Sequence, residues 1–154
     1  MSERTDRIER FVDFDVISEN WSAYELEDDT LIRTKNVLMD IIEAGPAVEK
    51  GSEFGVGAKL LNVVHSPSSL RGPKGKATEV KELEKFIVQP NMKFRQIKDG
   101  GPAKYETKNS TITLVTRVRR IEKTSKFDAK GMPAYIIRTE NQILVEKKTE
   151  TENI

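Results

Sequence analysis

The chain has 154 residues and a mass of 17.5 kDa, which is the size of one domain. Hydrophobic residues make up 36% and charged residues 33%, and no run of 18 apolar residues occurs, so we expect no membrane span. The absence of cysteine excludes disulfides, thiolate zinc sites and cysteine nucleophiles, and with one histidine we expect no metal or other cofactor. Because the first residues lack the pattern of a secretory signal, we expect a cytoplasmic protein.

The net charge of +1 conceals an uneven distribution of charge along the chain. Residues 1–50 contain 6 Lys and Arg against 13 Asp and Glu, whereas residues 51–154 contain 20 against 12. The acidic first part and the basic remainder can contact each other or other molecules. The alternative is a mixed surface in which the two signs interleave after folding.

The first third of the chain predicts mostly strands. Residues 1–10 alternate in charge and are typical of a short helix or a flexible tail. Residues 11–16 alternate between apolar and acidic and predict a half-buried strand. Residues 21–27 and 30–35 flank an Asp-Asp pair and predict a β-hairpin. The apolar run 37–42 fits either a strand or a helical turn.

The middle of the chain contains the clearest loop. A strand is predicted over residues 54–63, with two glycines that indicate a bulge or a close backbone approach. Residues 66–76 hold two prolines and two glycines and predict a loop. A short helix is expected at residues 78–85, with Thr78 as its N-cap.

The remainder is rich in β patterns separated by turns. Strands are expected within residues 86–88, 92–97, 111–123, 135–138 and 143–145, with turns at 99–102, 109–110 and 128–131. We therefore predict a mainly β protein: a small antiparallel barrel or sandwich with one or two short helices. The expected organisation is an N-terminal helix or tail (1–10), a single β-rich domain (11–145) and a flexible C-terminal tail (146–154).

The segment 111–123 is the most informative for function. Strand periodicity places Ile112, Leu114 and Val118 on one face, and Arg117, Arg119 and Lys123 on the other. Arg117 and Arg119 would then lie about 7 Å apart, near the spacing of successive phosphates along a nucleic-acid strand. From Lys59 to Arg138 there are 18 basic and 7 acidic residues. The alternative interpretation is an ordinary polar outer face of a sheet.

Two further segments extend this basic pattern. The expected strand at 92–97 carries Lys93 and Arg95, and the 66–76 loop carries Arg71, Lys74 and Lys76. Together with Arg117 and Arg119, these residues predict a face that binds nucleic acid or another polyanion.

Other constellations favour structural roles. His65 and Ser66 adjoin, but neighbouring strand residues point to opposite faces, so we predict no catalytic pair. Glu25, Glu27 and Asp28-Asp29 form an acidic cluster that is typical of a solvated hairpin turn. No catalytic residues are therefore assigned.

We expect a non-enzymatic binding module with a basic sheet face formed by Lys93, Arg95, Arg117 and Arg119. One alternative is a homo-oligomeric assembly protein, in which acidic and basic surfaces of different subunits meet or exposed strand edges pair. A weaker alternative is an enzyme that uses carboxylates such as Glu25 and Glu27.

Overall fold

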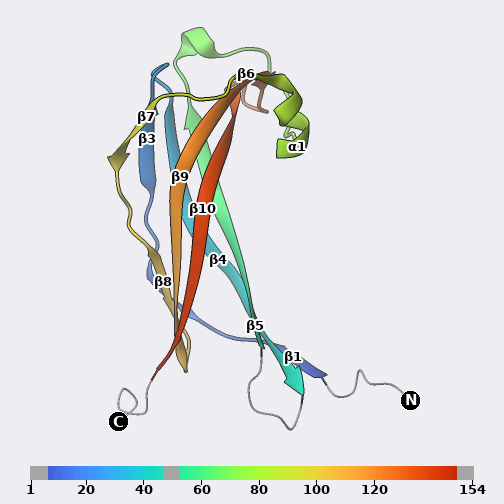
Figure 1. The fold of residues 1–154 in the computed structure, drawn as a ribbon, viewed down its shortest axis with the longest axis vertical. Coiled ribbons are helices and arrows are strands. Elements are labelled where there is room, and N and C mark those ends of the chain that lie inside the picture. The colour runs from blue at the N-terminus through green and yellow to red at the C-terminus, as the bar shows by residue number, and fades with distance from the viewer. Residues whose placement is uncertain (1–6, 47–52, 149–154) are drawn as a thin grey trace, which may run out of the picture.

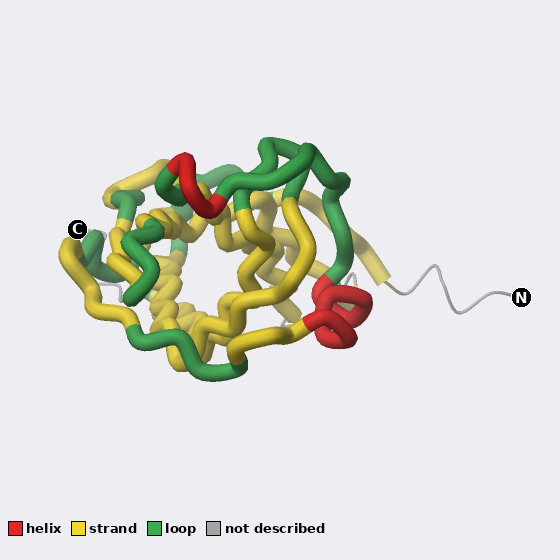
Figure 2. Tube along the Cα trace, turned by 90° about the horizontal axis from the view of Figure 1, so that it is seen from above, coloured by secondary structure: helices red, strands yellow, loops and turns green. Residues whose placement is uncertain are grey.

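The computed structural model describes residues 7–46 and 53–148, and strands predominate in these ranges (Figure 1). They form two antiparallel sheets, which confirms the predicted mainly β fold. Seen from above, the strands are arranged around a common interior (Figure 2). Two long hairpins, one in each sheet, form the frame on which the shorter strands assemble.

The first sheet is organised around one long strand. Its members are β1 (Arg7–Phe11), β3 (Ser22–Leu26), β4 (Leu31–Pro46), β5 (Glu53–His65) and β7 (Phe94–Lys98). β4 pairs with β5 on one side, and on the other side it pairs first with β3 and then with β1. β7 extends the sheet by pairing with β3.

The second sheet has the same plan. Its members are β2 (Asp15–Ser18), β6 (Ile87–Gln89), β8 (Ala103–Glu106), β9 (Ser110–Phe127) and β10 (Pro133–Lys147). β9 pairs with β10 along one side, and with β8 and β6 at separate places along the other. β2 completes the sheet by pairing with β8.

The helices are short. They are the 3-10 turns η2 (Ser68–Leu70) and η3 (Glu84–Phe86) and the α-helix α1 (Val80–Leu83). Of these, α1 and η3 lie against β10 and β9 of the second sheet. The predicted cap is wrong: Glu79 occupies the N-cap position, and the Thr78 hydroxyl donates instead to the Lys76 carbonyl (3.1 Å). Arg138 holds this segment against the sheet by donating to Glu84 and to the buried Glu122, at 2.7 Å each.

Several predicted boundaries need correction. Residues 7–11 form a strand rather than a helix, because they pair with residues 42–46 of β4; residues 1–6 lie outside the described part. The predicted strand at 11–16 is interrupted between β1 and β2, where the chain passes from the first sheet to the second. The 37–42 run is strand, within β4. β10 continues to Lys147, beyond the predicted end at 145, and residues 149–154 lie outside the described part.

Both sheets contribute to a core that has two clusters. One contains Leu38, Ile41, Ala103, Tyr105, Ile112 and Leu114. The other contains Tyr24, Leu26, Ile32, Met92 and Ile121. Because each cluster draws side chains from both sheets, burial of these residues holds the sheets face to face.

A bulge at Arg119 changes which side chains of β9 point inward. Thr139 pairs with Val118 and Arg138 pairs with Arg120, so Arg119 is the extra residue. One inserted residue reverses the alternation, and Ile121 is consequently buried although Ile112 and Leu114 are buried before the bulge. Lys123 lies two residues after the buried Ile121 and therefore shares its interior face. The predicted grouping of Lys123 with Arg117 and Arg119 on one face is wrong.

Candidate functional site

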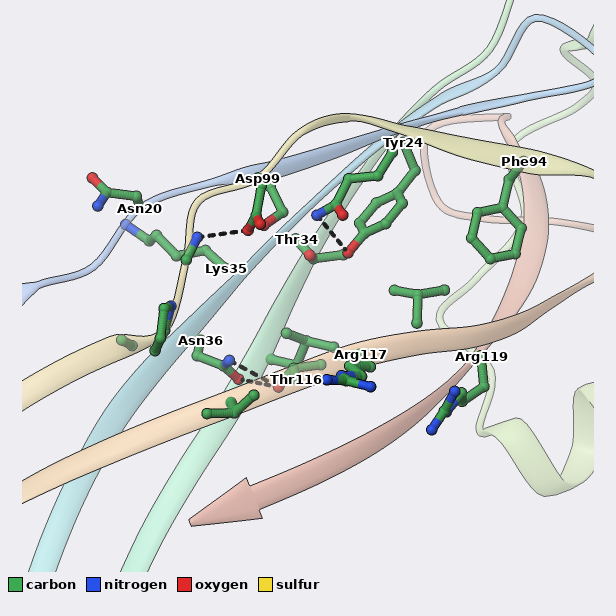
Figure 3. A pocket seen from close by; sticks show the side chains of 18 residues that line it. Asn20, Tyr24, Thr34, Lys35, Asn36, Phe94, Asp99, Thr116, Arg117 and Arg119 are labelled. Carbon is green, nitrogen blue, oxygen red and sulfur yellow. Dashed lines mark hydrogen bonds between the residues drawn. The ribbon is translucent and has the colours of Figure 1, made fainter. Parts of the chain in front are cut away.

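A cleft of about 410 Å³ opens between β7 of the first sheet and β9 of the second (Figure 3). This volume lies within the range of roughly 300–1,000 Å³ that is typical of ligand pockets. The cleft exists because β9 pairs with β8 through Leu114 and with β6 only from Lys123 onward. Over the intervening residues, β9 has no strand on this side in the described part of the chain.

The crossing from β7 to β8 forms one wall of the cleft. Gly101 has a φ of 74° and lines the cleft beside Pro102. The predicted turn at 99–102 is wrong, because these residues carry the chain from β7 of the first sheet on to β8 of the second. A side chain at Gly100 would lie 2.7 Å from the carbonyl oxygens of Asn20 and Trp21. The Gly100 N–H donates to the Ser22 hydroxyl (3.0 Å), which fixes this crossing against β3.

Cations outnumber carboxylates in this cleft. Lys35, Arg117 and Arg119 line it together with one carboxylate, Asp99. Glu19 lies 3.6 Å from Lys35, and Glu140 forms an ion pair with Arg119. Arg117 forms no ion pair or hydrogen bond with any residue that the structure describes, and its side chain is exposed. Although Glu140 lies opposite Arg117 on β10, its carboxylate pairs with Arg119, so the cleft offers an anion one guanidinium without an ion-pair partner among the described residues.

Aromatic rings lie on the β3 and β7 side of the same cleft. The rings of Tyr24 and Phe94 meet edge to face, with their centroids 6.0 Å apart. Gln96 donates to the Tyr24 hydroxyl at 3.4 Å. Burial raises the pKa of Tyr24, and the charge of Asp99 acts in the same direction, so this hydroxyl remains neutral at physiological pH. Figure 3 shows Phe94 across the cleft from Arg119.

A polar bridge joins the two sheets at the base of the cleft. The Asn36 side-chain amide donates to the Thr116 hydroxyl (2.8 Å), and Thr116 is also within 2.9 Å of Asn141 Oδ1. Asn36 and Thr116 also line a second groove, of about 230 Å³, between β5 and β10. The mutual hydrogen bond holds Asn36 and Thr116 in place, and both side chains carry donors and acceptors that can bond to a ligand.

The structure separates the predicted basic residues instead of placing them on one sheet face. Lys93 and Arg95 lie at β7 of the first sheet, whereas Arg117 and Arg119 lie on β9 of the second, so the predicted single face is wrong. Arg95 pairs with Glu25 (2.9 Å). The loop of Arg71, Lys74 and Lys76 lies beside the β9–β10 turn, because Gly72 and Gly75 donate to Gly131 and Asp128.

Glu27 and Asp29 of the acidic hairpin turn are exposed, as the sequence predicts, but Asp28 is not a solvated turn residue. Asp28 Oδ2 accepts hydrogen bonds from Tyr135 (2.6 Å) and from Lys123 Nζ (2.9 Å), and Asp28 is only partly exposed. Thr30 and Ser66 are fully buried and share a 2.9 Å hydrogen bond. The acidic and basic parts of the chain therefore meet within one molecule, and Ser66 has a structural hydrogen-bonding role here.

The three tyrosines of the chain should ionise at a higher pH than free tyrosine does. Burial, followed by hydrogen bonds to Glu19 and Asp28 respectively, raises the pKa of Tyr105 and of Tyr135 to about 12. A raised tyrosine pKa means that folding favours the protonated form, so this contribution to stability is lost as pH rises above about 10. Absorbance at 295 nm should show little ionisation of the folded protein near pH 10. A full three-tyrosine transition at pH 10 without unfolding would contradict these burials.

Sequence reasoning did not find Tyr24, Lys35, Asn36, Gln96 and Thr116 as cleft residues. Their proximity depends on the register between sheets, which no local pattern encodes.

In the described ranges, no three His, Asp or Glu side chains are grouped closely enough to hold a metal ion. None of the helices described here is long and apolar enough to span a membrane. Comparison of the chain with protein-family models, curated proteins and solved structures yields no match.

Proposed function

We propose that this protein is a non-enzymatic module that binds single-stranded nucleic acid in the cleft between β7 and β9. The observation that carries the proposal is the guanidinium of Arg117, which has no partner among the described residues, at a cleft that also contains the rings of Phe94 and Tyr24. A phosphate would pair with Arg117, and an adjoining base would pack against Phe94.

This combination of groups suits a single strand better than a duplex. Proteins that hold single strands combine a positively charged groove with aromatic side chains on which bases stack. A cleft of about 410 Å³ can receive an unstacked base, whereas a duplex presents its bases inside the stack. The amide groups of Asn36 and Gln96 provide hydrogen bonds to base edges.

Cations outside the cleft supply a longer-range attraction. Lys74, Lys76 and Lys93 are exposed, and their ammonium groups have no hydrogen-bond or ion-pair partner in the described ranges. Lys93 lies beside the β3–β4 turn, where its backbone N–H donates to Glu27 (2.5 Å). These residues attract an approaching phosphate backbone without reading its sequence.

Replacement of Arg117 by Gln should weaken binding and make it less sensitive to salt. Loss of one phosphate contact to a single strand lowers the slope of log K against log salt by about 0.7. Fluorescence anisotropy of labelled single-stranded DNA and RNA, titrated at several salt concentrations, measures both quantities. Labelled duplex should bind more weakly than either single strand.

The matched control is Lys108→Gln, which removes an exposed cation at the β8–β9 turn, outside the cleft. This variant should keep the wild-type slope. Equal effects of R117Q and K108Q would show that binding is diffuse, and would contradict a role for the cleft. Equal competition by polyphosphate at matched charge would assign the site to polyanions in general.

A further inference from the structure

The second half of β10 is an exposed sheet edge with apolar side chains on both of its faces. Its neighbour on one side is β9, and no described strand pairs with its other side. Ile143, Leu144 and Val145 are 46%, 39% and 40% exposed. An unpaired edge of this kind is a template for another strand, and natural proteins normally protect such edges with charges or prolines.

The edge is exposed because the two long hairpins diverge. In Figure 1, β9 and β10 run toward the lower left, whereas β4 and β5 run toward the lower right. Ile143 and Val145 pair with the buried Leu114 and Ile112, so they lie on the core side of the second sheet. Both side chains remain exposed there, and Ile143 lines the open groove of about 230 Å³ between β5 and β10.

We propose that a second copy of this chain covers this edge, with the two β10 strands pairing antiparallel about a two-fold axis at Leu144. In a two-fold strand pair, one residue faces its own copy and the others pair symmetrically about it. This axis places Leu144 against Leu144, and Ile143 against Val145 of the second copy. Ile143 and Val145 from both copies then form one apolar cluster on the core side of a continuous sheet.

The charged and apolar residues along β10 favour a two-fold axis at Leu144 over an axis at Ile143 or at Val145. An axis at Leu144 places Gln142 opposite Glu146, Asn141 opposite Lys147 and Glu140 opposite Lys148. An axis at Ile143 would place Glu140 opposite Glu146, and like charges directly opposite each other are destabilising. An axis at Val145 would place Ile143 opposite Lys147 and Leu144 opposite Glu146, which breaks the apolar cluster. The Leu144 axis alone keeps apolar residues together and avoids a like-charged pair.

Two substitutions at the axis test the dimer. Because Leu144 faces its own copy, Leu144→Lys and Leu144→Glu each place like charges together and should raise the dimer dissociation constant at least about a hundredfold. An equimolar mixture of the two variants should recover a dimer, which also shows that both variants are folded. The control is Ile97→Lys, which places the same charge at a similarly exposed position on β7 (47%).

Sedimentation velocity over a concentration series gives the masses. We expect wild type and I97K to reach twice the 17.5 kDa chain mass, and each Leu144 variant alone to remain monomeric. Wild type that stays monomeric at all concentrations would overturn the proposal. A wild-type dimer that survives either Leu144 substitution, or a mixture that stays monomeric, would also overturn it. Capture of a heterologous β-strand peptide by monomeric wild type would assign the edge to a different partner.

Discussion

Replacement of Tyr105 by Ala should lower the free energy of unfolding by about 3–5 kcal/mol, as for other large aromatic residues in a core. Tyr105 is fully buried in the cluster with Ile112 and Leu114, and its ring meets Phe14 edge to face at 5.7 Å. Its removal leaves a cavity where β8 and β9 of the second sheet pack on β4 of the first. Urea denaturation followed by circular dichroism measures the loss.

The hydroxyl of Tyr105 serves as a hydrogen-bond partner for a backbone group of β4 that has no strand partner in the described part of the chain. Along one side of β4, β3 ends its pairing at Thr34 and β1 begins at Ile42, so Leu38 lacks a strand partner there. The Leu38 N–H donates to the Tyr105 hydroxyl (3.1 Å), which in turn donates to Glu19 (2.6 Å). Tyr105→Phe should therefore cost about 1–3 kcal/mol, because these groups lose a partner. Equal stability of wild type and Y105F would contradict this account.

Replacement of Asp28 by Asn should lower the free energy of unfolding by about 2–3 kcal/mol at neutral pH. Burial acts to raise the pKa of the Asp28 carboxyl, but hydrogen bonds from Tyr135, Lys123 and Thr30 outweigh it and hold the pKa below its usual value. The substitution leaves Lys123 partly buried without its counter-charge. Thermal and urea unfolding of both proteins measure the difference.

The loss of stability caused by Asp28→Asn should become smaller as the pH falls into the acid range. A carboxyl with a lowered folded pKa stabilises the protein above its unfolded pKa of about 3.9, and this stabilisation is lost as pH falls through the folded pKa. The stability difference between wild type and D28N should be constant from neutral pH to about pH 5, and should shrink at lower pH. A difference that grows in acid would mean that Asp28 is not held as a carboxylate.

The strands and turns were largely predictable from the sequence because they depend on local patterns. Alternation in segments such as 111–118 and turn residues such as Gly131 act over a few positions. The positive φ of Gly131 occurs in the predicted 128–131 turn that joins β9 to β10. These features predict where strands and turns lie along the chain, but not which strands pair with each other.

The candidate site was only partly predictable, for two physical reasons. The bulge at Arg119 reverses the faces of β9, so Lys123 lies beside Asp28 in the interior instead of beside Arg117. The cleft itself arises from the pairing of β9 with β8 and β6 at separate places, which depends on contacts between distant segments. Arg117 was identified from the sequence, whereas Phe94, which lines the same cleft, was not assigned to the site.

The most direct test of the proposed binding site is a pair of ¹H–¹⁵N correlation spectra, recorded with and without a short single-stranded oligonucleotide. Binding in the cleft should shift the side-chain amides of Asn36 and Gln96 and the backbone amide of Arg117, and R117Q should reduce these shifts. Shifts confined to the loop of Lys74 and Lys76, or none at millimolar oligonucleotide, would contradict the assignment of the cleft as the nucleic-acid site.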